Sequence, residues 1–165
     1  MLIVLDACTL INLVNGEVLA QVLNLPGCQF LVSPMVQEEL PSIAEAVDHA
    51  VGSGRLNFVD DEVISAKEFA EAKRAMHLGN GETECILAAE KLECHVACDD
   101  RQARQRAKDR LGDPNRVVGS IGLLRMLCET GFFNQEQALA AYRLMRDRGG
   151  YLPDVTVDTF APNPA

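Results

Sequence analysis

Short apolar runs alternate with longer amphipathic segments along almost the whole chain. Each apolar run has the length of one strand, and the segments between the runs repeat apolar residues with the 3.6-residue period of a helix. The predicted strands cover residues 2–5, 29–32, 56–59, 95–98 and 116–118. Strands that alternate with helices form βαβ units, whose helices cover both faces of a mainly parallel sheet. The sequence therefore predicts a three-layer α/β/α fold with a central sheet of about five strands.

Predicted helices occupy the gaps between these strands. They cover residues 8–24 with a break, 34–51 with a break near Pro41, 62–77, 82–93, 100–111, 120–130 and 135–148. A chain of 165 residues is of ordinary size for one domain, so we expect a single domain over residues 1–148. Residues 149–165 contain three prolines and no helical period. This stretch, the C-terminal tail, is predicted to be extended and to pack on the domain or on a neighbouring subunit.

Acidic residues follow two of the predicted strands directly. Asp6 ends the first apolar run, and Asp99 and Asp100 end the fourth. The carboxyl ends of parallel strands meet at one edge of a sheet, where α/β folds bind their ligands. Carboxylates gathered there are typical ligands of a hard metal ion. The sequence therefore predicts a metal site at this edge.

Two further acids lie on the apolar stripes of predicted helices. Glu39 lies three residues after Val36 on such a stripe, whereas Glu38 points away. Glu82 shares the apolar face of the helix after residue 81, whereas Glu84 is turned roughly 160° from that face. A carboxylate on an apolar stripe is costly to bury unless it is paired or bound to a cation. Glu39 and Glu82 are therefore the inward candidates.

Each of these acids also has a purely structural interpretation. Glu82 could be a first-turn acid favoured by the helix dipole, and Glu39 a paired edge residue. Asp6 and Asp100 could cap the helices that follow them. The four acids together are explained better by one metal site than by four separate structural roles.

The charge pattern points to a local basic surface on an acidic protein. A net charge of −9 argues against a protein whose whole surface attracts nucleic acid. However, Arg101, Arg104 and Lys108 share one helical face directly after the acidic pair. They could bind phosphates that flank the metal site, or they could form a solvated face. With two tyrosines and no tryptophan, an extended base-stacking surface is not expected.

The six cysteines and the N-terminus point to an intracellular protein. The chain contains no CxxC motif, and most cysteines lie in apolar segments, so reduced thiols are expected. Alternation along a strand places Cys94 and His95 on opposite faces, which disfavours a zinc site. Only five apolar residues precede Asp6, which predicts neither a signal peptide nor a membrane span. We therefore expect a cytoplasmic protein.

Five segments, in order along the chain, resemble the PIN-domain family. This family is the nuclease domain of VapC-type toxins and of several RNA-processing enzymes. The segments are residues 3–11 (IVLDACTLI), 32–40 (VSPMVQEEL), 79–89 (GNGETECILAA), 96–101 (VACDDR) and 119–124 (GSIGLL). The family's acidic positions fall on Asp6, Glu39, Glu82 and Asp100, the same four acids that position and periodicity favour.

The chain also departs from the family pattern at three places. The third acid, Glu82, is aspartate in many relatives, and Cys98 replaces the usual threonine or serine before the last acid. Because Asp99 and Asp100 are adjacent, either one could bind the metal. Glu84 remains an alternative to Glu82.

The resemblance implies metal-dependent hydrolysis of RNA phosphodiester bonds with Mg²⁺ or Mn²⁺. It implies that Asp6 and Asp100 hold the principal ion and that Glu82 and Asp99 complete or orient the site. It also implies that Glu39 positions or deprotonates water.

The resemblance extends to the substrate and to partner proteins. Ser120 is a candidate contact to the ion's water or to a substrate phosphate. An antitoxin partner and a homodimer are further implications. The alternative is a catalytically inactive PIN-like module that binds nucleic acid or protein.

Other metal enzymes with parallel sheets fit the sequence less well. A haloacid-dehalogenase-type phosphatase needs a second aspartate two residues after Asp6, where this chain has Cys8. A receiver domain would have its paired acids near the first strand, and here the pair follows the fourth.

Overall fold

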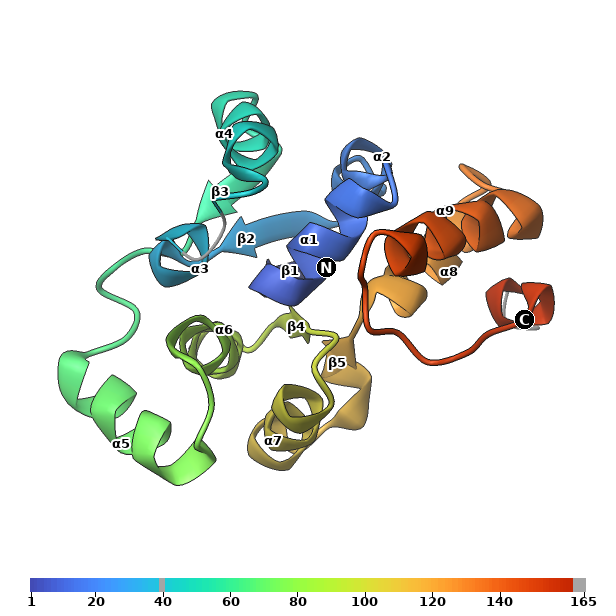
Figure 1. Cartoon of the computed structure of the whole chain (residues 1–165). Helices are drawn as coiled ribbons and strands as arrows, with labels where there is room; N and C mark the ends of the chain where they lie inside the picture. The colour runs from blue at the N-terminus through green and yellow to red at the C-terminus, as the bar shows by residue number, and fades with distance from the viewer. Residues whose placement is uncertain (39–40, 162–165) are drawn as a thin grey trace.

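Five parallel strands form one sheet at the centre of the molecule (Figure 1). The computed structural model describes residues 1–38 and 41–161. Its strands are β1 (Leu2–Leu5), β2 (Gln29–Val32), β3 (Leu56–Phe58), β4 (His95–Ala97) and β5 (Val117–Val118). Their spatial order is β3-β2-β1-β4-β5, and every neighbouring pair is parallel.

The strand order reverses beside β1. The chain runs from β1 outward to β2 and β3, and then returns to place β4 on the other side of β1. Leu5, the last residue of β1, lies opposite Ala97, the last residue of β4. A crevice at the carboxyl ends of such a pair is where open α/β sheets bind ligands. Asp6 and Asp99 follow these two strands and therefore lie beside the crevice.

Helices cover both faces of the sheet. They are α1 (Ala7–Asn15), α2 (Leu19–Leu23), α3 (Pro34–Glu38), α4 (Ala44–Gly52), α5 (Ala66–Met76), α6 (Asn80–Lys91), α7 (Arg101–Leu111), α8 (Ser120–Glu129) and α9 (Gln135–Asp147). The helices α1, α2, α8 and α9 contact one another, whereas α6 packs between α5 and α7 in a second group (Figure 1). The predicted three-layer α/β/α architecture is confirmed. Within residues 1–38 and 41–161, no helix combines the length and the apolar character that crossing a membrane requires.

Two helix starts differ from the prediction by two residues or more because of their capping residues. The helix predicted from residue 62 begins at Ala66, because Ser65 forms a capping box with Glu68. The helix predicted from residue 82 begins at Asn80, since Gly79 adopts the extended conformation of an N-cap. Glu82 is therefore the third residue of α6 rather than its first.

The C-terminal tail packs along α8 and α9 as far as it is described. An extended stretch after Gly149 leads to a short 3₁₀ helix, η2 (Val157–Phe160). The Tyr142 hydroxyl of α9 donates to the carbonyl oxygen of Pro153 at 2.6 Å. The Phe160 side chain is fully buried, so the tail contributes to the hydrophobic core.

Candidate functional site

Asp6 is a buried acid at the carboxyl end of β1, beside β4. Its side chain is 1% exposed, and its backbone N–H donates to the carbonyl oxygen of Ala97 at 2.9 Å. It occupies the N-cap position of α1, but its carboxylate makes no capping hydrogen bond to the described turn of that helix. The capping interpretation of Asp6 therefore does not account for its burial.

Asp99 is held between two helices by three hydrogen bonds. Its Oδ2 accepts from Asn12 Nδ2 of α1 at 2.8 Å and also from the Ser120 hydroxyl. Its Oδ1 accepts from the Ser120 backbone N–H at 2.9 Å, at the first turn of α8. Asn12 and Ser120 are both buried, so they set the orientation of the Asp99 carboxylate.

Asp100 has a different local role. It is exposed, and its Oδ1 accepts from the backbone N–H of Ala103 at 2.8 Å. This is the N-cap hydrogen bond of α7. Asp100 therefore caps α7, as its structural interpretation predicted, whereas the Asp99 carboxylate faces α1 and α8.

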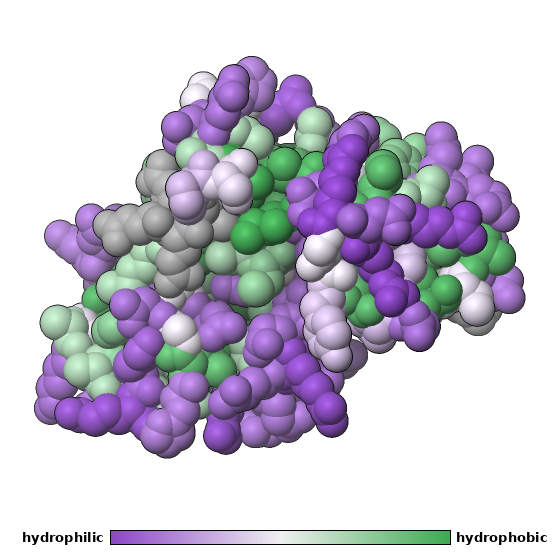
Figure 2. Space-filling model, viewed as in Figure 1, coloured by the Kyte–Doolittle hydropathy of each residue, from purple (hydrophilic) through white to green (hydrophobic). Residues whose placement is uncertain are grey.

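The side chain of Arg104 is turned toward the sheet. Its Nη1 donates to the carbonyl oxygens of Cys98 and Val118, at 2.9 and 2.7 Å, and so joins the ends of β4 and β5. Of the predicted basic face, Arg101 is exposed and Lys108 is half-buried. Figure 2 shows a hydrophilic surface over α7, as a phosphate contact there requires. Arg104 is already engaged by backbone carbonyls.

The side chains of Asp99 and Arg104 both come close to the backbone at Gly119. A Cβ atom at Gly119 would lie 2.7 Å from Asp99 Oδ1 and 2.6 Å from Arg104 Nη1. Both separations are shorter than real Cβ contacts, so any side chain at this position would displace one of the two groups. Gly119 lies between the strand predicted at 116–118 and the helix predicted at 120–130, and the sequence contained no signal for this close approach.

Glu82 and Glu84 are both half-buried on α6. Glu82 Oε2 accepts from the backbone N–H of Gly79 at 2.8 Å, which is a first-turn capping contact. Glu84 Oε2 accepts from the backbone N–H of Met35 at 3.2 Å, at the start of α3. Glu84 therefore contacts a neighbouring helix through one of its carboxylate oxygens. Periodicity alone missed this contact because α6 packs against helices on several sides and not along one stripe.

The pKa of the Cys8 thiol is raised in part by the negative charges of the acids. Burial of the thiol and, after it, the negative charges of four carboxylates together raise the pKa of Cys8 to about 12. In order of effect, they are Asp6, Glu82, Asp99 and Asp100. Four of the acids singled out in the sequence thus lie close enough to act on one atom at the first turn of α1.

The oxygen donors at this site fit a hard cation. Glu39 lies outside the described residues. Across the described ranges, no three His, Cys, Asp or Glu side chains form a group able to hold a metal ion. Mg²⁺ is commonly bound by one or two protein carboxylates and keeps several waters, so a pair of acids is sufficient. Asp6 and Asp99 come after the neighbouring strands β1 and β4, and hydrogen bonds from α1 and α8 hold Asp99.

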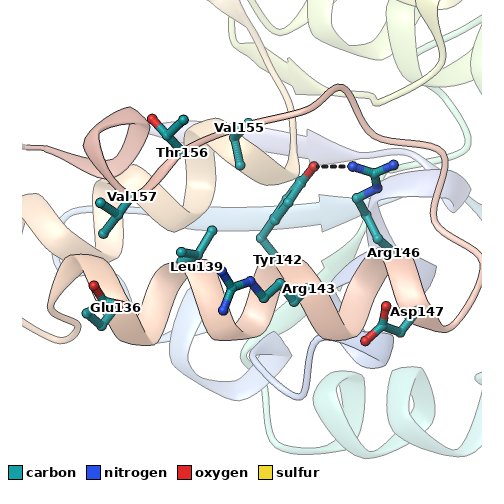
Figure 3. Close-up of a pocket in the computed structure, with 9 residues that line it drawn as sticks. All are labelled: Glu136, Leu139, Tyr142, Arg143, Arg146, Asp147, Val155, Thr156 and Val157. Atoms are coloured by element: carbon teal, nitrogen blue, oxygen red, sulfur yellow. Dashed lines mark hydrogen bonds between the residues drawn. The ribbon is translucent and has the colours of Figure 1, made fainter.

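Another groove lies apart from these acids. It has a volume of about 760 Å³ and runs between α9 and the C-terminal tail (Figure 3). Tyr142, Arg143 and Val155 are among the residues that line it, and Arg146 Nη1 donates to the Tyr142 hydroxyl at 3.1 Å. None of the site residues predicted from the sequence lines this groove.

Comparison with known proteins places nearly the whole chain in one family. A family model described as a PIN domain matches residues 2–162. No curated protein and no solved structure matches the chain.

Proposed function

The chain belongs to the PIN-domain family, whose members are generally nucleases, and on this premise we propose that it is a Mg²⁺- or Mn²⁺-dependent endoribonuclease. One observation carries the proposal. Asp6 is buried at the end of β1, and Asp99 is held by three hydrogen bonds after the end of the neighbouring strand β4. Buried, oriented carboxylates in a ligand-binding crevice are suited to hold a cation against a phosphodiester.

We assign the principal ligand positions to Asp6 and Asp99. Asp99 is preferred to Asp100 because buried donors orient it, whereas the Asp100 carboxylate caps α7. Glu82 is half-buried, and its charge raises the pKa of Cys8 together with the charges of Asp6 and Asp99. A bound Mg²⁺ or Mn²⁺ would lower the pKa of its water and neutralise charge on the phosphate. Glu39 remains a predicted member of the set.

Contacts to RNA are assigned to two cations of α7 beside the acids. Arg101 is exposed next to Asp100, and Lys108 lies two turns further along α7. Because the net charge is −9, such cations would attract the backbone locally and not over the whole surface. A cytoplasmic location, an antitoxin partner and a homodimer stay predictions from the sequence.

The test is cleavage of structured RNAs in Mn²⁺ by wild-type protein and by Asp6→Asn. We expect Asp6→Asn to lose at least about 100-fold in rate, since metal catalysis supplies several kcal/mol. The exposed Asp61→Asn is the matched control and should cleave normally. Equal cleavage by wild type and Asp6→Asn would rule out this site.

The alternative is an inactive module that binds nucleic acid or protein. It is favoured by the fact that, outside residues 39–40 and 162–165, no three metal-ligating side chains form a group. A cation that binds only the folded state raises the melting temperature. We expect millimolar Mn²⁺ to raise the melting temperature of wild type but not of Asp6→Asn. No shift for wild type, together with no cleavage, would favour the inactive module.

A further inference from the structure

Asn12 is a polar residue on the buried face of α1, which also carries Thr9. Its side chain is 4% exposed, and its neighbours Leu10 and Leu13 are fully buried. A buried amide needs hydrogen-bond partners, because an unpaired one loses its hydration without compensation. Asn12 Nδ2 finds its partner in Asp99 Oδ2 at 2.8 Å, 87 residues along the chain.

The opposite end of the amide is enclosed by the turn after α9. A Cβ atom at Gly150 would lie 2.5 Å from Asn12 Oδ1 and 2.8 Å from the carbonyl oxygen of Met145. Only glycine leaves room for the amide at this position. The Gly150 backbone is itself fixed, because its N–H donates to the Met145 carbonyl at 2.8 Å.

The ends of α1 and α9 are also joined beside this amide. Arg148 Nη1 donates to the carbonyl oxygen of Asn15 at 2.7 Å, and Asn15 Nδ2 donates back to the Arg148 carbonyl at 3.4 Å. The turn at Gly150 is therefore held against α1. Rotation of the Asn12 amide is limited on one side by this turn and on the other by Asp99.

We propose that Asn12 is a positioning residue, which holds the Asp99 carboxylate in the orientation that binds the cation. This role rests on the proposed function. A neutral N–H donor suits the position, because it fixes one lone pair of Oδ2 without adding a positive charge that would compete with the cation. Gly150 contributes to the same positioning, because the turn at this residue keeps the Asn12 amide in place.

The test measures Mn²⁺ binding to the RNA-free protein by calorimetry, together with the kinetics of RNA cleavage. Asn12→Leu removes the donor at similar volume, and Asn12→Ala is the second variant if the leucine is poorly accommodated. Gly150→Ala keeps the donor but pushes on the amide. Loss of a residue that orients a metal ligand typically weakens metal affinity by about 10- to 100-fold. We expect a loss in this range for the Asn12 variants, a smaller loss for Gly150→Ala, and an unchanged KM for RNA at saturating Mn²⁺.

Two controls separate positioning from general damage. Leu13→Ala disturbs the packing of α1 beside Asn12 but removes no donor, so it should lower stability and leave Mn²⁺ affinity unchanged. Gly52→Ala is the control for Gly150→Ala, because it adds a Cβ atom at a place where no other atom lies within 4 Å. If folded Asn12→Leu and Asn12→Ala bind Mn²⁺ as tightly as wild type, the positioning role is wrong and the proposed function stands. If wild type itself binds no Mn²⁺, the proposed function fails and the role of Asn12 fails with it.

Discussion

Gly119 is a residue at which a single added carbon would press directly on Asp99. A Cβ atom there would lie 2.7 Å from Asp99 Oδ1 and 2.6 Å from Arg104 Nη1. We expect Gly119→Ala to displace the Asp99 carboxylate and to lower Mn²⁺-dependent cleavage by about tenfold or more. Overpacking should also cost about 1–3 kcal/mol of stability, measured by urea unfolding.

Gly122 provides the control for this prediction within the same helix. A Cβ atom at Gly122 would lie 3.7 Å from Val118 Cβ, an ordinary contact. Gly122→Ala should preserve cleavage and raise stability by about 0.5–1 kcal/mol, because alanine favours a helix interior. Full activity in Gly119→Ala would contradict the role given to this close approach.

Arg101 and Arg104 are neighbours on α7 with different expected roles. Arg104→Met removes the donor to the Cys98 carbonyl, whereas the Val118 carbonyl keeps the Cys98 backbone N–H at 3.2 Å. We therefore expect a loss of about 1–3 kcal/mol in unfolding free energy. Arg101→Gln changes an exposed side chain and should leave stability within about 0.5 kcal/mol. If Arg101 contacts a phosphate, its loss should reduce the salt dependence of RNA binding by about one counterion. Binding measured from 50 to 200 mM salt would show this change, and a slope equal to that of wild type would speak against it.

At the scale of single elements, the N-terminus of α5 depends on the charge of Glu68. Hydrogen bonds from Lys91 first, and then from Ser65, lower the pKa of Glu68 to about 2. Because the folded-state pKa lies below the ordinary value of 4.5, the charged group stabilises the fold above that value. The stabilisation is lost as the pH falls through 4.5 toward 2.

The measurement compares thermal unfolding of wild type and Glu68→Gln between pH 7 and pH 3. We expect wild type to melt at the higher temperature, by a steady margin above pH 5. The margin should narrow below about pH 4.5, as the unfolded chain begins to take up a proton at this group. A margin that widens on acidification would mean that the capping box and the ion pair with Lys91 are not the source of the effect.

Some elements were predicted from the sequence better than others, because local apolar runs are visible in the sequence, whereas backbone conformation and contacts between distant segments are not. Strand positions follow from local apolar runs, and all five predicted strands have counterparts in the sheet. The start of α6 was missed by two residues, because Gly79 caps it through backbone conformation, which composition does not reveal. The orientation of Glu84 was missed because it depends on α3, a helix distant in sequence.

At the scale of the whole molecule, the C-terminal tail is part of the folded core. Phe160 is fully buried and contacts the Tyr142 ring at a centroid distance of 6.3 Å. Phe160→Ala should therefore destabilise the protein by about 3–5 kcal/mol in urea unfolding. Tyr151 in the same tail is 99% exposed, and Tyr151→Ala should change stability by less than about 0.5 kcal/mol. Equal stability of both variants would indicate that the tail does not pack as described.

The sequence by itself determined the parallel sheet and the acids at its edge. Asp6 and Asp99 directly follow apolar runs, and a residue that directly follows a strand lies at the end of that strand. Only the tertiary structure distinguished Asp99 from Asp100, because the distinction depends on donors from Asn12 and Ser120. Those donors are 87 and 21 residues away along the chain. Side chains so distant meet only through packing, and local periodicity carries no information about such contacts.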